Sequence, residues 1–249
     1  MNSSSNPERL PSHLVERPWG GEIWYTPEAP LSLLVKFIYT HEALSVQVHP
    51  GDDYAAKHHS SRGKTEMWHI VKAAPDARLA LGFREAISRE RLRESALSGE
   101  IEGLLNWVHP REGDTFFTPA GTVHAIGAGL ELWEIQQHSD ITYRLYDYGR
   151  GRELHLEHAL NVTNREALDP RPATLPVHSE YFEVDRLDFE GSREFQPDSQ
   201  RYELLVAMEG AGTIGRQPFS PRETWYLAAG SPHFQIVANQ PSRFLTVAS

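Results

Sequence analysis

Four side chains of the kinds that bind divalent metal ions stand in short, ordered motifs: Gln47, His49, Glu66 and His124. Gln47 and His49 are two residues apart in an alternating stretch that ends at Pro50, so on a strand both side chains enter the same face. Glu66 belongs to the next expected strand, and His124 follows a tight Pro-x-Gly turn. This arrangement is typical of a small β-barrel that holds one metal ion.

The donor set indicates which metal the barrel would hold. Two imidazoles, a carboxylate and an amide oxygen suit Zn²⁺, with Mn²⁺, Co²⁺ and Fe²⁺ as alternatives. Because Glu66 is the only anionic donor, the site would keep about one positive charge. Such a charge can polarise a hydroxyl–carbonyl pair and stabilise an enediolate. We therefore expect one Zn²⁺ per chain in an enzyme of sugar chemistry.

The other histidines are expected not to bind this metal. On a strand, Glu66 and Trp68 share one face, so His69 points the opposite way. Isolated histidines are more often packed or solvated than ligands. This interpretation applies to His41, His58, His59, His109, His155, His158, His178 and His233.

Charged residues near these motifs are candidates for substrate contacts. Asp140, Thr142 and Arg144 alternate along an expected strand, and Arg144 offers fixed donors to a phosphate or a developing oxyanion. The alternative is an Asp–Arg pair on a solvated strand. Lys64 stands two residues before Glu66, where it is either a cation beside the metal or a surface lysine at a strand end.

Composition limits the remaining classes. The chain has 249 residues, a net charge of −10 and no cysteine, which excludes disulfides and thiolate zinc sites. The acidity argues against a nucleic-acid partner and requires a local positive pocket for any anionic substrate. No run approaches the roughly eighteen apolar residues of a membrane span, and the start lacks the apolar core of a secretory signal. We expect a cytoplasmic protein with a small-molecule partner, and its oligomeric state is open.

The patterning predicts a mainly β chain with a small helical insertion. Strands are expected at 31–40, 43–49, 65–71, 131–137, 140–148, 202–208 and 223–227. Helices are expected at 84–98, 101–108 and 154–162, and residues 50–53 are expected to form a loop.

Two domains are expected. The first, residues 1–164, is a catalytic barrel with the helical insert near 84–108, and the proline-containing stretch 165–178 leads into the second, 165–249. Near the end of the second domain, a Gly-x-x-His ending at His233 repeats the ending at His124. That domain has no Gln-x-His strand and no matching glutamate, so we predict a second barrel without a metal.

The motifs resemble those of the type I mannose-6-phosphate isomerases (phosphomannose isomerases) of the cupin superfamily, in their short bacterial form. The resemblance rests on the segments 19–21, 44–50, 63–66, 117–127, 130–137 and 139–147. It implies two cupin jelly-roll barrels and a zinc ion bound by Gln47, His49, Glu66 and His124. It also places the active-site lysine, arginine and aspartate of the family on Lys64, Arg144 and Asp140. The chain departs from the family at Gly63 and His138, and in a shorter stretch between Gly21 and Leu31.

The reaction implied is the interconversion of mannose 6-phosphate and fructose 6-phosphate by proton transfer between C1 and C2 through a cis-enediol. Lys64 and Asp140 are the candidates for proton handling, and spacing does not decide which is the base. Arg144 is the candidate for contact with an oxyanion or the phosphate. The alternatives are an isomerase of another, unphosphorylated sugar, an iron-dependent cupin oxygenase, and a sugar-binding cupin that keeps the metal without catalysis. Oxygenase sites usually offer more histidines, so Gln47 argues against that class.

Overall fold

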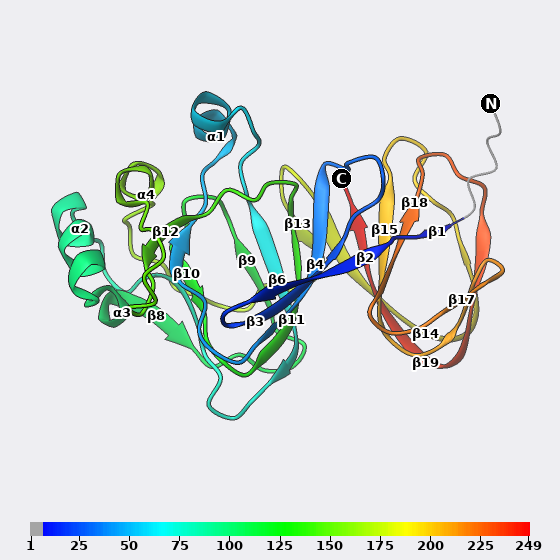
Figure 1. Cartoon of the computed structure of the whole chain (residues 1–249). Coiled ribbons are helices and arrows are strands. Elements are labelled where there is room, and N and C mark those ends of the chain that lie inside the picture. Colours follow the sequence, from blue (N-terminus) through cyan, green and yellow to red (C-terminus); the bar gives the residue numbers. More distant parts are fainter. Residues whose placement is uncertain (1–6) are drawn as a thin grey trace. The chain divides into compact units, whose positions relative to one another are not determined.

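The computed structural model describes residues 7–249, within which there are four helices and nineteen strands (Figure 1). The chain forms two compact units. We call residues 13–24 and 34–173 the N-terminal barrel, and residues 7–12, 25–33 and 174–249 the C-terminal barrel. This division differs from the predicted one, because 165–173 group with the first unit and 7–12 and 25–33 with the second.

The N-terminal barrel consists of two antiparallel sheets. One has the order β2 (Ser12–Arg17), β3 (Gly20–Tyr25), β4 (Leu33–Thr40), β11 (Leu130–Gln137), β6 (Glu66–Ala73), β9 (Thr115–Thr118). The other has the order β12 (Tyr143–Tyr146), β5 (Val46–Val48), β10 (His124–Ile126), β7 (Leu79–Phe83), β8 (Leu105–Val108). Sheets packed in this way bury one face of each strand between them.

Apolar side chains from both sheets meet between them. Trp68, Phe116 and Leu132 of the six-stranded sheet share one buried cluster with Leu79 and Ile126 of the five-stranded sheet. Complete burial of side chains of this size contributes roughly 1.5–3 kcal/mol each. This cluster supports the strands that carry the candidate metal ligands.

Helices cover the other face of the five-stranded sheet. They are α1 (Asp52–His59), α2 (Arg89–Ser98), α3 (Ile101–Leu104) and α4 (Leu156–Val162). Leu92 of α2 and Leu160 of α4 are fully buried in one cluster with Val48 and Leu145 of the sheet. Figure 1 shows α2, α3 and α4 beside the edge strands β8 and β12. The expected helical insertion is therefore present and packs on the barrel.

Three local predictions need correction. Helix α2 begins at Arg89, because Ser88 caps it by accepting a hydrogen bond from the Arg91 backbone N–H. Residues 105–108, predicted as helical, form β8 and pair with β7. Residues 50–53 were expected to form a loop, but α1 begins at Asp52 and runs to His59. Acidic residues in its first turn and basic residues in its last favour this helix through the macrodipole.

The C-terminal barrel contains the eight-stranded sheet. Its strands are β1 (Glu8–Arg9), β13 (Val177–His178), β14 (Glu183–Phe195), β15 (Glu203–Glu209), β16 (Gly212–Ile214), β17 (Gln217–Phe219), β18 (Glu223–Leu227) and β19 (Phe234–Ala248). Trp225, Phe219 and Phe244 are the largest members of its buried cluster. The short β1 pairs with β18, so both ends of the described chain contribute to one sheet. Within residues 7–249, no helix is long and apolar enough to cross a membrane.

Candidate metal centre and active site

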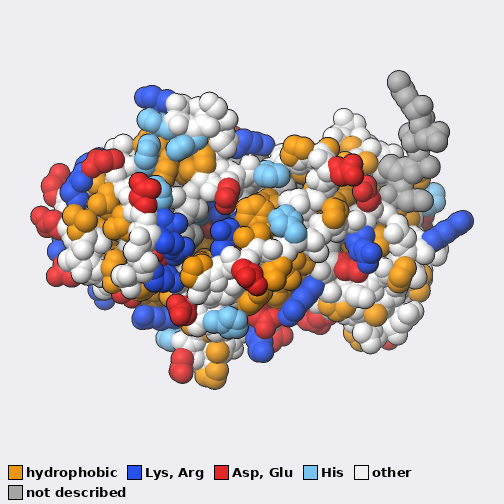
Figure 2. Space-filling model, viewed as in Figure 1, with side chains coloured by type: hydrophobic (Ala, Val, Ile, Leu, Met, Phe, Trp, Pro, Cys, Tyr) orange, Lys and Arg blue, Asp and Glu red, His pale blue; other side chains and the backbone are white. Residues whose placement is uncertain are grey.

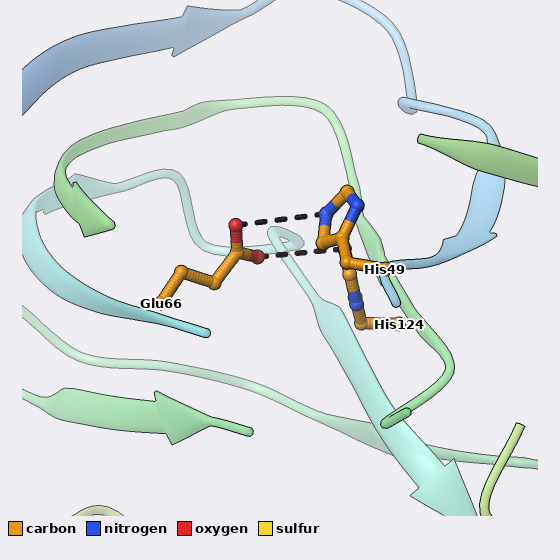
Figure 3. Close-up of side chains that lie close together, drawn as sticks. All are labelled: His49, Glu66 and His124. Carbon is orange, nitrogen blue, oxygen red and sulfur yellow. Dashed lines mark ion pairs between the residues drawn. The ribbon is translucent and has the colours of Figure 1, made fainter. Parts of the chain in front are cut away.

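His49, Glu66 and His124 converge between the two sheets of the N-terminal barrel. The distance from His49 Nε2 to Glu66 Oε2 is 3.6 Å, and that from His124 Nε2 to Glu66 Oε1 is 3.5 Å. Figure 3 shows the carboxylate directed at both imidazoles. All three side chains are buried. His49 directly follows β5 rather than lying on it, a small correction to the predicted strand.

Both imidazoles present an unprotonated nitrogen to the carboxylate. Nδ1 of His49 donates to the Ile141 carbonyl at 2.9 Å, and Nδ1 of His124 donates to the Thr122 carbonyl at 2.9 Å. A carbonyl only accepts, so each proton resides on Nδ1 and the Nε2 lone pair faces the site. Burial lowers the pKa of His49 well below its ordinary value and that of His124 to about 4. Both rings are therefore neutral at pH 7, the form that binds metal.

Gln47, the fourth predicted ligand, lies in the middle of β5. Its Nε2 donates to His124 Nε2 at 3.2 Å, while its Oε1 accepts from Ser45 Oγ at 3.0 Å. A half-turn of the amide brings the oxygen to the same position. In the sheet register Gln47 lies opposite His124 of β10 and also opposite Arg144 of β12. One residue thus connects the candidate metal centre with the candidate substrate contact.

The spacing and the polar atoms left without partners fit a divalent ion. In the described chain, His49 Nε2 and Glu66 Oε1 are buried without a hydrogen-bond partner, which costs roughly 1–3 kcal/mol per atom. Donors around a tetrahedral zinc ion lie roughly 3.4 Å apart, close to the separations found here. Burial also raises the pKa of Glu66 to about 7, against the charges of Lys64 and Lys36, and a bound cation would oppose this shift. The residues present therefore fit the zinc that the sequence predicts.

A cavity of about 210 Å³ lies beside this group. Four of the predicted metal-binding and active-site residues line it: Gln47, Lys64, Asp140 and Arg144. Its other lining residues are Arg17, Trp19, Glu22, Lys36, Ile38, Leu44, Ser45, Glu134, Thr142 and Arg152. A small polar ligand in this cavity would contact charged groups on several sides.

Lys64 belongs to a buried network of charges. Its Nζ lies 3.0 Å from Glu66 Oε2 and 3.8 Å from Glu134 Oε2, and Lys36 Nζ lies 3.1 Å from the same Glu134 oxygen. Burial lowers the pKa of Lys64, but the charges of Glu134 and Glu66 outweigh it and hold the pKa above its ordinary value. Lys64 is therefore a cation at neutral pH.

Asp140 and Arg144 reach the cavity from different elements. The predicted strand 140–148 is shorter, since β12 begins at Tyr143 and the exposed Asp140 lies in the preceding loop. Gln136 fixes that loop by donating its amide to the carbonyls of Gln137 and Ser139. Arg144 Nη1 donates to the Glu153 carbonyl at 2.7 Å, and its buried Nε has no partner in the described chain.

Sequence reasoning missed several charged residues of the cavity, above all Lys36 and Glu134. Lys36 is the one charge in the apolar segment 31–40, and Glu134 stands between the apolar Trp133 and Ile135. A charge in a buried strand is rarely tolerated unless it is paired. That signal could have predicted their ion pair.

Comparison with known proteins identifies relatives in sequence and in structure. The scan against family models found no match. The chain is 38% identical over 212 residues to "Probable mannose-6-phosphate isomerase GmuF" of Bacillus subtilis, covering 78% of this chain and 67% of that protein. It is 36% identical over 209 residues to "Mannose-6-phosphate isomerase" of Streptococcus mutans, covering 77% of this chain and 66% of that protein. The aligned part thus spans about two thirds of the length of these relatives.

Solved structures agree with this result. The mannose 6-phosphate isomerase from Bacillus subtilis superimposes with a TM-score of 0.87 at 25% identity, covering 98% of this chain and 99% of that one. A mutant phosphomannose isomerase from Salmonella typhimurium gives a TM-score of 0.74 at 14% identity over 98% and 100% of the two chains, a likeness of fold. The predicted mainly β, cupin-type fold and the predicted family are confirmed. The chain belongs to the mannose-6-phosphate isomerase family.

Proposed function

We propose that this chain is a zinc-dependent aldose–ketose isomerase that interconverts mannose 6-phosphate and fructose 6-phosphate through a cis-enediol. Family membership supports the reaction, since the sequence relatives carry the isomerase name. The observation that carries the proposal is the position of the His49–Glu66–His124 group next to a charged cavity lined by Lys64 and Arg144.

Gln47, His49, Glu66 and His124 are the residues that would hold the zinc ion. When bound, the ion supplies positive charge that favours the anionic form of the sugar oxygens at C1 and C2. The neutral imidazoles and the single carboxylate would leave about one positive charge on the site.

The remaining residues of the cavity would bind the open-chain sugar and move its proton. Lys64, held as a cation by Glu66 and Glu134, would donate a hydrogen bond to a substrate oxygen as charge develops there. Asp140 makes no ion pair in the described chain and lines the cavity, so its carboxylate is available to accept the C2 proton and return it to C1. Arg144 would hold an oxyanion or the phosphate with its fixed donors.

An activity assay with metal control tests this proposal. Zinc-loaded protein should convert mannose 6-phosphate to fructose 6-phosphate, lose turnover on chelation and regain it with added zinc. Substrate labelled with deuterium at C2 should lose part of the label to water if an enediol forms, whereas complete transfer to C1 would indicate hydride transfer.

Two results would redirect the proposal. Turnover of mannose but not of its 6-phosphate would indicate an isomerase of unphosphorylated sugars. Calorimetric binding of mannose 6-phosphate without turnover, at full zinc occupancy, would indicate a sugar-binding protein. Asp140→Asn should lower kcat while leaving the zinc content unchanged, which separates proton transfer from loss of metal.

A further inference from the structure

The charges around the cavity are unevenly balanced. Near the candidate metal centre, Lys36 and Lys64 are matched by Glu134 and Glu66 in buried ion pairs. Elsewhere on the wall, Arg17 is matched by Glu22 at 2.8 Å. Paired charges of this kind present little net field to a ligand.

A second group of charges, on and after β12, carries an excess. Arg144, Arg150 and Arg152 surround one buried carboxylate, that of Asp147, and the further anion near Arg144, Glu153, is exposed to solvent. The charges of Arg152 and Arg150 add to burial in holding the pKa of Arg144 below its ordinary value, which reflects how close the three lie. The exposed Glu42 lies 3.8 Å from Arg150, on its solvent side. Figure 2 shows Lys and Arg side chains gathered on this face of the N-terminal barrel.

Arg152 lines the cavity and is oriented by two bonds to one carboxylate. Its Nε donates to Asp147 Oδ2 at 2.8 Å, and its Nη2 pairs with Oδ1 of the same carboxylate. The two parallel bonds fix the plane of the guanidinium. In the described chain Nη1 has no partner, and Arg152 lines the cavity. Asp147 thus orients the Arg152 guanidinium and leaves its Nη1 free to donate to a ligand.

Arg150 shares the carboxylate but not the cavity. It donates to Asp147 Oδ1 at 2.9 Å and lies over the ring of Tyr148 at 5.2 Å, and it is absent from the cavity wall. Arg150 therefore contributes the same charge as Arg152 at a similar bond distance from Asp147, without a route to a ligand. This makes it a matched control.

We propose that Arg152 binds the phosphate of the sugar-phosphate substrate through Nη1, with Asp147 as the positioning residue that orients it. That the ligand is a sugar phosphate rests on the proposed function. That the site binds an anion rests on the charges of the arginines alone. Arg144 and Arg152 both line the cavity, so two positive charges are available there for a phosphate dianion. In a protein of net charge −10, such a local group is needed to hold an anionic substrate.

The proposal assigns substrate selection to Arg152. The sugar carbons would react near Lys64 while the phosphate remains at the arginine group. An unphosphorylated hexose would lack the second contact and gain nothing from Arg152. Loss of Arg152 should therefore lower kcat/KM for mannose 6-phosphate more than kcat/KM for mannose.

The test compares Arg152→Gln, Arg152→Lys and Arg150→Gln as zinc-loaded full-length proteins. Loss of a charge-assisted hydrogen bond predicts a rise of about 10- to 100-fold in KM for mannose 6-phosphate in Arg152→Gln, with kcat changed less. Arg152→Lys keeps the cation without the planar fork and should give an intermediate KM. Arg150→Gln should change KM less than about 3-fold, since a partly exposed charge away from the ligand is screened. Zinc content and thermal unfolding establish that each variant is folded and loaded.

Calorimetric titration with inorganic phosphate supplies a readout that does not require turnover. Wild-type protein and Arg150→Gln should bind phosphate, and Arg152→Gln should bind it at least about 10-fold more weakly. If Arg150→Gln and Arg152→Gln lost equal phosphate affinity, a general effect of positive charge would replace direct contact between Arg152 and the phosphate. Normal KM and normal phosphate binding in Arg152→Gln would overturn the proposal while leaving the isomerase intact. Arg152-dependent phosphate binding in a protein without isomerase activity would support the subsite and overturn the proposed reaction.

Discussion

Lys36 Nζ and Glu134 Oε2 lie 3.1 Å apart on the neighbouring strands β4 and β11, and both side chains are buried. Trp68 Nε1 donates to the other oxygen of Glu134 at 3.3 Å, so the carboxylate is held on both sides. Burial by itself would raise the pKa of Glu134, but the charges of Lys64 and Lys36 outweigh it, and the pKa lies below its ordinary value. The pair therefore stays ionised inside the barrel.

Removing this carboxylate should destabilise the barrel strongly. Glu134→Gln leaves two lysines facing each other without their shared anion, and breaking a buried ion pair costs about 3–5 kcal/mol. Urea unfolding at pH 7 measures the loss. Glu131→Gln is the control on the same strand, because its pair with Lys72 is 3.8 Å long and the lysine is exposed, so that this pair should be worth less than about 1 kcal/mol. Equal losses in the two variants would contradict the assigned importance of the buried pair.

Metal binding should depend on His124 and not on the histidine that ends the similar Gly-x-x-His motif. His124→Ala removes an Nε2 donor from the buried group and should weaken zinc binding by on the order of 100-fold or more, with loss of turnover. His233→Ala should retain the full zinc content, since His233 is exposed and lies 3.5 Å from Glu194 of the C-terminal barrel. Elemental analysis after dialysis against a weak chelator gives both values. Full zinc in the His124 variant would remove it from the ligand set.

Loss of Arg144 should lower turnover without changing the zinc content of the protein. Arg144→Gln removes a cation whose partly open guanidinium lines the cavity, and kcat/KM for mannose 6-phosphate should fall by about 100-fold. The zinc content should remain that of the wild type, because Arg144 lies opposite Gln47 on the adjacent strand and is not a metal ligand. Near-normal kcat/KM would show that Arg144 does not contact the substrate.

The stability contributed by Asp147 should depend on pH. Burial raises its pKa, but the hydrogen bond from Arg152 and the charges of Arg150 and Arg152 outweigh it, so the pKa in the folded protein is below its ordinary value. A lowered carboxyl pKa gives stability that is present above the unfolded pKa and lost as the pH falls through the folded pKa. Asp147→Asn should therefore cost about 1.5–3 kcal/mol at pH 7, and the difference from wild type should shrink in acid.

Urea unfolding at several pH values checks this prediction. Asp169→Asn is the control, since its pair with Arg171 is exposed on both sides and should be worth little at any pH. A difference between Asp147→Asn and wild type that stays constant down to low pH would show that the carboxylate charge is not the cause.

The candidate metal residues could be predicted from the sequence because their spacing follows strand geometry. A two-residue interval in a strand places two side chains on one face, and this holds for Gln47 and His49 although β5 ends between them. Glu66 lies on β6 and His124 begins β10 after a tight turn, so that both side chains meet His49 between the two sheets.

The rest of the cavity could not be predicted in the same way. Lys36 and Glu134 lie in strands that are buried on both faces, where alternation gives no signal for direction. Arg152 reaches the cavity from the turn after β12, through a bond to Asp147 that has no fixed spacing. Helix α1 is short, and its sign in the sequence is the acidic residues of its first turn and the basic residues of its last. Residues 105–108 have an apolar pattern compatible with helix or strand, and pairing with β7 decided between them.

The register of β5 fixes the distance between the candidate metal ligands and Arg144. This three-residue strand lies between β10 and β12, and Gln47 stands opposite His124 on one side and Arg144 on the other. Adjacent strands are about 4.8 Å apart, so the sheet itself determines how far the arginine is from the metal ligands. Inserting one residue into β5 would turn Gln47 to the opposite face. Loops around the cavity can therefore diverge in length without moving the centre, whereas this strand cannot gain or lose a residue.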